Sequence, residues 1–184
     1  MIISINGPAG SGKSTVAKML AEKLDWPRHY MGGLRRAKAK ERGMTLAEYN
    51  KLGETDPSTD MEVDEYQTEL GKKQDNFIIE GRTSWHFIPH SFKIYIDVSE
   101  QVGAERIWND LQEENDRNED KNLNSVEDVV KSQRQRRESD NKRYKKYFDI
   151  EVYKPNNYDL VIDTSNLTRD EVFDKVWSAI KNKI

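Results

Sequence analysis

The stretch Gly7-Pro8-Ala9-Gly10-Ser11-Gly12-Lys13-Ser14 decides the fold, because it matches the pattern G-x-x-x-x-G-K-[ST] at every fixed position. Residues 2–5 before it have the composition of a short buried strand, and apolar residues at helical spacing follow from Ser14 onward. A strand, a glycine-rich loop and a helix in this order are the context in which the pattern binds phosphate groups. The motif therefore predicts a phosphate-binding loop, and a chance glycine-rich turn is the disfavoured alternative.

The residue types in this loop suit a nucleoside triphosphate. Glycines let the backbone curl so that successive N–H groups point at one anion, and the start of the following helix adds partial positive charge. Lys13 would neutralise the β- and γ-phosphate oxygens, and the Ser14 hydroxyl would bind Mg²⁺. We therefore expect ATP as the phosphoryl donor, with Mg²⁺ as its cofactor.

Outside the loop, strand and helix signals alternate along the chain. Residues 77–79, 94–98 and 160–162 have the pattern of interior strands, and Thr168 with Glu171 forms a capping box before a final amphipathic helix. Alternating helices and β-branched strands predict an α/β fold with a parallel sheet and crossover helices.

The composition excludes proteins that depend on cysteine and gives no sign of a membrane-spanning helix. The chain has 184 residues, a formal net charge of −3 and no cysteine, so disulfide frameworks, thiol catalysis and cysteine metal sites are excluded. No apolar run approaches the roughly 18 residues of a membrane helix, and the first residues lack the basic start of a signal peptide. We expect a cytoplasmic small enzyme or switch, without a membrane partner and with nucleic acid unlikely as a ligand.

The segment Glu80-Gly81-Arg82 ends a predicted strand and carries the second chemical signal. A carboxylate at the end of a strand beside the loop strand would approach Mg²⁺ directly or through water. Arg82 would direct its fork of donors at an anionic acceptor. The alternative is that the strand simply ends here in a loop, with Glu80 and Arg82 as a solvent-exposed charge pair.

A third signal lies on a basic helix predicted from Ser125 to Tyr147. Arg136, Asp140 and Arg143 have i, i+4 and i+7 spacing, so they share one helix face and could clamp phosphates and ribose hydroxyls. Spacing alone favours a solvated face with ordinary ion pairs, and a basic helix also leaves RNA binding open. Arg36, in the basic patch 35–42, is either a phosphate ligand or part of a helix surface.

The order of these motifs resembles the archaeal-type cytidylate (CMP) kinases, over residues 1 to about 180. The resemblance is carried by GPAGSGKS, Gly32, Arg36, Asp56-Pro57, Asp60, EGR at 80–82, RxxxDxxR at 136–143 and the segment 158–165. GPAGSGKS and EGR are shared with many nucleoside monophosphate (NMP) kinases. The RxxxDxxR spacing and the segment 158–165 are the specific features.

The resemblance implies a three-layer P-loop kinase fold in a single domain, with a central parallel sheet, a helical NMP-binding insert and a lid. The core would comprise about 1–31, 74–107 and 148–184, the insert about 32–73, and the lid with the basic helix about 108–147.

The resemblance also implies the roles of individual residues. The catalytic residues would be Lys13, Arg82, Arg136 and Arg143. The ATP-binding residues would be Gly7, Pro8, Ala9, Gly10, Ser11, Gly12, Lys13, Ser14, Thr15, Arg106 and Ser165. The CMP-binding residues would be Gly32, Arg36, Asp60, Arg82, Arg136, Asp140 and Arg143. The metal ligands would be Ser14 and Glu80.

The expected activity is ATP-dependent phosphorylation of CMP, with dCMP as a further acceptor, by a monomer. Departures from the family pattern after Asp64, after Arg82 and in the lid leave the acceptor base less defined than the phosphate chemistry. Trp85 and His86 are candidates for the base pocket, with packing as the favoured role, and Arg117 is a candidate lid arginine. The alternatives are a kinase for UMP or AMP, and an ATP-binding switch that holds RNA or a protein.

Overall fold

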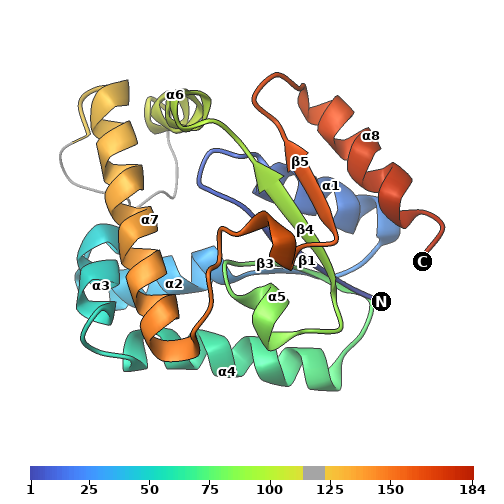
Figure 1. Ribbon diagram of the computed structural model, residues 1–184, viewed down its shortest axis with the longest axis horizontal. Coiled ribbons are helices and arrows are strands. Elements are labelled where there is room, and N and C mark those ends of the chain that lie inside the picture. The colour runs from blue at the N-terminus through green and yellow to red at the C-terminus, as the bar shows by residue number, and fades with distance from the viewer. Residues whose placement is uncertain (114–122) are drawn as a thin grey trace.

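The computed structural model describes residues 1–113 and 123–184, around a five-stranded sheet whose neighbouring strands all run parallel (Figure 1). The strands, in the spatial order β2-β3-β1-β4-β5, are β1 (Ile2–Asn6), β2 (Arg28–Tyr30), β3 (Phe77–Glu80), β4 (Phe92–Asp97) and β5 (Leu160–Asp163). The predicted α/β class and parallel sheet are confirmed. Strand β2 was not predicted, because its three residues, Arg-His-Tyr, are polar or partly exposed and show no strand periodicity.

The helices lie between these strands, or after the last of them, in the sequence. They are α1 (Lys13–Leu24), α2 (Met31–Glu41), α3 (Leu46–Gly53), α4 (Ser58–Lys73), α5 (Ser84–Phe87), α6 (Glu100–Leu111), α7 (Val126–Phe148) and α8 (Arg169–Ile180), with a 3₁₀ turn η1 (Pro155–Asn157). Capping boxes begin α3 at Thr45 and α8 at Thr168, and the second confirms the capping box predicted from Thr168 and Glu171. None of the described helices is long and apolar enough to span a membrane.

Alternating side chains of the strands divide the core into two apolar layers. Ile3 and Ile5 of β1 face α1 and α8, whereas Ile2 faces the other side of the sheet, where α4 and α5 lie. Because successive residues of a strand point to opposite faces, five consecutive buried residues in β1 require a cover on both faces. The three-layer arrangement expected from the family resemblance is therefore present.

Helix α7 is the long basic helix predicted from residues 125–147. Ser125 caps its first turn by accepting a hydrogen bond from the Asp128 N–H, and Asp149 ends it in a left-handed conformation. A small apolar cluster that includes Ile107 and Val129 joins α7 to α6. Figure 1 shows α7 running along one side of the molecule, past α6 and α3.

A buried ion-pair network also fixes α7 to the helices of the 32–73 segment. Arg143 is 1% exposed, and its guanidinium donates to both carboxylate oxygens of Asp60 on α4, at 2.7 and 2.6 Å. The same guanidinium pairs with Asp140 one turn earlier on α7. Removing one member of such a network leaves the other charges buried without a partner, which costs more than an exposed ion pair contributes.

We predict that Arg143→Met lowers the free energy of unfolding by about 3–5 kcal/mol, because Asp60 and Asp140 lose a shared buried cation. Lys142→Met is the matched control, since Lys142 pairs with Glu54 at an exposed position and its loss should cost less than about 1 kcal/mol. Urea unfolding of both variants measures the difference. Equal midpoints and slopes for the two variants would contradict a stabilising role for Arg143.

Candidate active site

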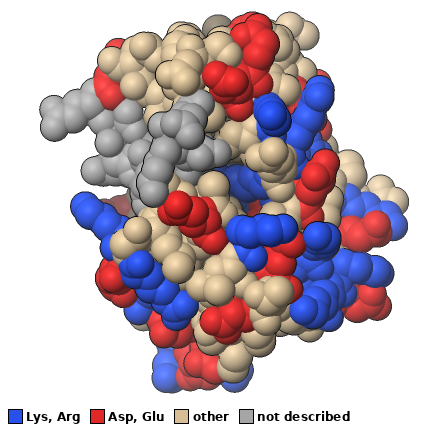
Figure 2. All heavy atoms as spheres, turned by 90° about the vertical axis from the view of Figure 1, so that its left-hand side faces the viewer, with Lys and Arg blue, Asp and Glu red and all other residues tan. Residues whose placement is uncertain are grey.

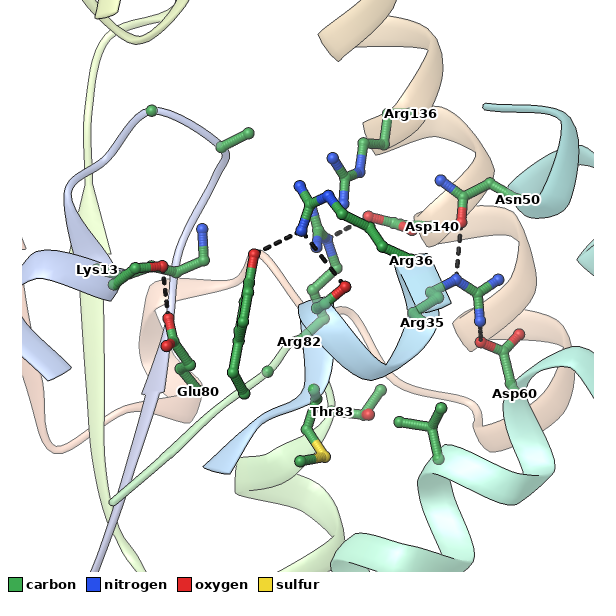
Figure 3. A pocket seen from close by; sticks show the side chains of 18 of the residues that line it. Lys13, Arg35, Arg36, Asn50, Asp60, Glu80, Arg82, Thr83, Arg136 and Asp140 are labelled. Atoms are coloured by element: carbon green, nitrogen blue, oxygen red, sulfur yellow. Dashed lines mark hydrogen bonds and ion pairs between the residues drawn. The ribbon is translucent and has the colours of Figure 1, made fainter. Parts of the chain in front are cut away.

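A cavity of about 370 Å³ opens where the strands β1, β2 and β3 end, which is the edge at which parallel sheets bind ligands (Figure 3). The glycine-rich loop and helices α1, α2, α3, α4, α6 and α7 contribute the remaining lining residues. The predicted site residues that line it are Ala9, Gly10, Gly12, Lys13, Ser14, Thr15, Gly32, Arg36, Asp60, Glu80, Arg82, Arg106, Arg136 and Asp140. The sheet therefore brings together residues from segments that are more than 120 positions apart in the sequence.

The glycine-rich loop depends on backbone conformations that only glycine adopts without strain. Gly10 and Gly12 have φ angles of 76° and 83°. A Cβ atom on Gly10 would lie 2.2 Å from the carbonyl oxygen of Gly103, so the loop backbone presses against the backbone of α6. Gly7, Pro8 and Ser11 belong to the loop but are not among the residues lining the main cavity.

Lys13 begins helix α1 and lies in a positively charged environment. Its ammonium group donates to the Pro8 carbonyl at 3.0 Å. Burial, followed by the positive charge of Arg82, lowers the pKa of Lys13 to about 7. The site therefore holds an excess of positive potential next to the helix N-terminus, which favours a multiply charged anion.

Ser14 and Glu80 form a pair of hard oxygen ligands beside the loop. The Ser14 hydroxyl donates to Glu80 Oε2 at 2.6 Å, and the carboxylate is 1% exposed. Glu80 Oε1 lies 3.3 Å from Arg28 Nε and accepts no hydrogen bond from the described residues. This donor set fits Mg²⁺, which takes few protein oxygens when phosphates and water complete its coordination.

Three arginines form the cationic wall of the cavity, which we define as Arg36, Arg82 and Arg136. In Figure 3 their guanidinium groups gather in the middle of the view, between Lys13 on one side and Asp60 on the other. Arg36 donates to the hydroxyl of Tyr30 and to the carbonyl oxygen of Gly32, so the end of β2 and the first turn of α2 fix its direction. A fork of donors held in this way suits a phosphate group.

Arg82 is held from behind by Asp140 and Tyr153. Its Nε donates to the Tyr153 hydroxyl at 2.7 Å, its guanidinium pairs with Asp140, and the hydroxyl donates to Asp140 Oδ2 at 2.7 Å. Burial opposes ionisation of Asp140, but Arg82 and Arg143 together hold the pKa of this carboxyl well below its usual range. The carboxylate therefore stays ionised and anchors Arg82 in position.

Arg143 and Asp60 occupy positions that differ from the expected direct contacts with an acceptor. Arg143 is not among the residues lining the cavity, and its interactions with Asp60 and Asp140 are buried. Asp60 lines the cavity, but its carboxylate is shared by Arg143 and Arg35. The spacing predicted that Arg143 shares a helix face with Arg136 and Asp140. Packing against α4 buries its side chain outside the cavity, where it holds the carboxylates of Asp60 and Asp140 in position.

A second hollow, of about 210 Å³, lies on the far side of the loop between α1 and α8. Arg106 lines both hollows and donates to the Gly10 carbonyl and to Thr164. Thr164 lines this second hollow, whereas Ser165 does not: its hydroxyl donates to Asp163 and accepts from the Ser99 N–H. Ser165, predicted as an ATP-binding residue, therefore lines neither hollow, whereas its neighbour Thr164 lines this one.

Sequence reasoning missed several cavity residues and proposed others that lie elsewhere. The lining residues it did not assign include Tyr30, Arg35, Asn50, Asp64, Thr83 and Tyr144. Trp85 and His86 are not among the lining residues and pack in an aromatic cluster with Tyr158 and Phe148, which agrees with their favoured packing role. Arg117 and much of the acidic stretch 110–120 lie outside the described residues.

Solved structures with a similar arrangement support the fold. The chain superposes on shikimate kinase from Bacteroides thetaiotaomicron with a TM-score of 0.66 and 13% identity, covering 98% of both chains. An uncharacterised protein from Eubacterium ventriosum gives a TM-score of 0.69 at 17% identity, also covering 98% of both chains. At these identities the likeness concerns the fold alone.

Sequence relatives are much closer. A protein named cytidylate kinase from Methanocella arvoryzae is 37% identical over 180 residues, covering 98% of this chain and 97% of its own. One of the same name from Methanocaldococcus jannaschii is 38% identical over 188 residues, covering 99% and 98%. The model of the cytidylate kinase-like family matches residues 2–166. The chain belongs to the cytidylate kinase-like family and is a nucleoside monophosphate kinase.

Proposed function

We propose that the protein transfers the γ-phosphoryl group of ATP to CMP, and that dCMP is a further acceptor. The observation that carries the proposal is the cationic wall, which faces Lys13 across one cavity. Two sets of anion-binding groups in one cavity suit two phosphorylated substrates. Relatives named cytidylate kinase support CMP as the acceptor.

The transfer needs alignment and charge compensation. The glycine-rich loop and Lys13 would hold the β- and γ-phosphates, and the cationic wall would hold the acceptor phosphate in line with them. An acceptor oxygen forms a bond to the γ-phosphorus while the bond from that phosphorus to the β,γ-bridging oxygen breaks, and ADP leaves. Since the acceptor oxygen is already anionic, no general base has to remove a proton.

The metal would be held by Ser14 and Glu80. When bound, Mg²⁺ would supply positive charge to the β- and γ-phosphate oxygens. Glu80 is kept in place by the Ser14 hydroxyl and by Arg28, so the ligand oxygens are ordered before a nucleotide arrives. Burial of the carboxylate restricts its rotamers and favours one arrangement of the two ligands.

The surface of α7 supports a catalytic use of its arginines over RNA binding. Figure 2 shows Lys and Arg side chains interspersed with Asp and Glu on the face that includes α7. Arg134 pairs with Glu100 and Lys142 pairs with Glu54, so exposed cations of the helix are partly neutralised. Binding to a nucleic acid backbone relies instead on clustered cations of one sign.

The proposal is tested by ADP release with Mg-ATP against CMP, dCMP, UMP, AMP and GMP. We expect turnover with CMP and dCMP to exceed that with every other acceptor. If the enzyme prefers UMP or AMP, the proposed phosphoryl transfer from ATP stands and the proposed acceptor is wrong. ATP binding without turnover of any of the five would overturn the proposal.

We predict that Lys13→Met lowers kcat by at least about 100-fold, because it removes a preorganised cation from the transferring phosphoryl group. Lys18→Met, on the exposed side of the same helix, is the control and should retain normal turnover. Steady-state kinetics with unchanged circular dichroism spectra provide the measurement. Normal turnover of the Lys13 variant would remove Lys13 from the mechanism.

We also expect EDTA to abolish turnover and added Mg²⁺ to restore it. Glu80→Gln should raise the Mg²⁺ concentration for half-maximal activity by about tenfold or more, since a buried charged ligand is lost. Glu22→Gln, at an exposed position of α1, is the control. An unchanged Mg²⁺ dependence in the Glu80 variant would contradict its role as a ligand.

A further inference from the structure

A buried carboxylate in the cavity has one oxygen that accepts no hydrogen bond from the described residues. Asp64, on α4, lines the cavity and is 6% exposed. Its Oδ1 accepts hydrogen bonds from Gln67 Nε2 at 2.9 Å and from the Thr83 hydroxyl at 3.2 Å. Its Oδ2 is buried and has no hydrogen-bond partner among the described residues. A buried acceptor without a donor is costly, so this oxygen is suited to a donor that a ligand supplies.

The neighbours of Asp64 determine which of its two carboxylate oxygens lacks a hydrogen-bond donor among the described residues. The Ser84 hydroxyl donates to Gln67 Oε1 at 2.7 Å, and this bond sets the orientation of the Gln67 amide. Gln67 Nε2 then donates to both Asp64 Oδ1 and the Thr83 hydroxyl, which itself donates to the same Oδ1. All these side chains are at least nine-tenths buried, so the arrangement is rigid.

An acceptor nucleotide bound in the cavity would share that cavity with this oxygen. In Figure 3, Thr83 lies on the opposite side of the view from Arg136, with Arg82 between them. A nucleotide whose phosphate is held by the cationic wall would extend its base toward Thr83 and Asp64. Met31 and Val63 also line the cavity and are nearly buried, which provides apolar surface for a flat ring.

We infer that Asp64 Oδ2 selects cytosine over uracil by accepting a hydrogen bond from the exocyclic amino group of the base. This inference rests on the proposed function, because it names the group that chooses among pyrimidine monophosphates. Cytosine presents an amino donor at the ring position where uracil presents a carbonyl acceptor. An ionised carboxylate attracts the donor and repels the acceptor.

The charge of Asp64 supports this role. Burial, followed by the negative charge of Asp60 on the same helix, raises the pKa of Asp64 to about 7. The hydrogen bonds from Thr83 and Gln67 and the positive charge of Arg35 on α2 act in the opposite direction. Protonation converts Oδ2 from an acceptor into a donor, so lower pH should favour uracil. Arg143 of α7 faces this region through its ion pair with Asp60.

The test is the ratio of kcat/KM for CMP to that for UMP in the wild type, Asp64→Asn and Glu65→Gln. Gln67 and Thr83 hold the oxygen of the new amide at the Oδ1 position, so its NH₂ group replaces Oδ2 and presents a donor. We expect Asp64→Asn to lower the ratio by about tenfold or more, with UMP turnover rising. Glu65, the exposed neighbour on α4, is the matched control and should leave the ratio unchanged.

The same ratio is then followed between about pH 6 and pH 8, where kcat/KM reports groups of the free enzyme. In the wild type the ratio should fall as the pH falls, whereas in Asp64→Asn it should be flat. Asp60, Arg35 and Arg143 are unchanged in the variant, so a difference between the two profiles is due to Asp64. Equal profiles in the two proteins, or an Asp64→Asn ratio equal to that of the wild type, overturn the inference. A wild-type enzyme without CMP turnover would instead refute the proposed function.

Discussion

The carboxylate of Asp140 holds together parts of the chain that the sequence keeps far apart. It binds Arg82 from the end of β3, Tyr153 from the segment before β5, and Arg143 from its own helix. Arg143 in turn binds Asp60 on α4. If these ion pairs were lost, α7 would still pack on α6 through its apolar cluster, but Arg82 would lose the carboxylate that anchors it. The direction of Arg82 thus depends on its ion pair with Asp140.

The features that could be predicted from the sequence are those fixed by local chemistry. The glycine-rich loop, the capping boxes of α3 and α8 and the apolar strands beside them each follow from residue types over a few positions. The site residues at the strand ends follow from one further rule, that parallel strands end at a common edge. For these residues, the motifs already predict which side chains lie together, and the structure supplies the distances between them.

The remaining features depend on packing between distant segments. Strand β2 is three residues long and is recognisable only because β3 lies beside it. Arg143 and Arg136 share a helix face in the sequence, yet only the approach of α4 decides that Arg143 is buried in an ion pair. Asp64 was indistinguishable from other acidic residues of its helix until Gln67 and Thr83 occupied one of its two oxygens.

The contact between the glycine-rich loop and α6 has a mechanical consequence. It consists of backbone against backbone, because Gly10 has no side chain where the Gly103 carbonyl lies. Such a contact cannot be compressed by a change of rotamer, as a contact between side chains can. The loop therefore acts as a rigid stop against inward movement of α6. Inward motion of α6 would have to carry the phosphate-binding loop with it.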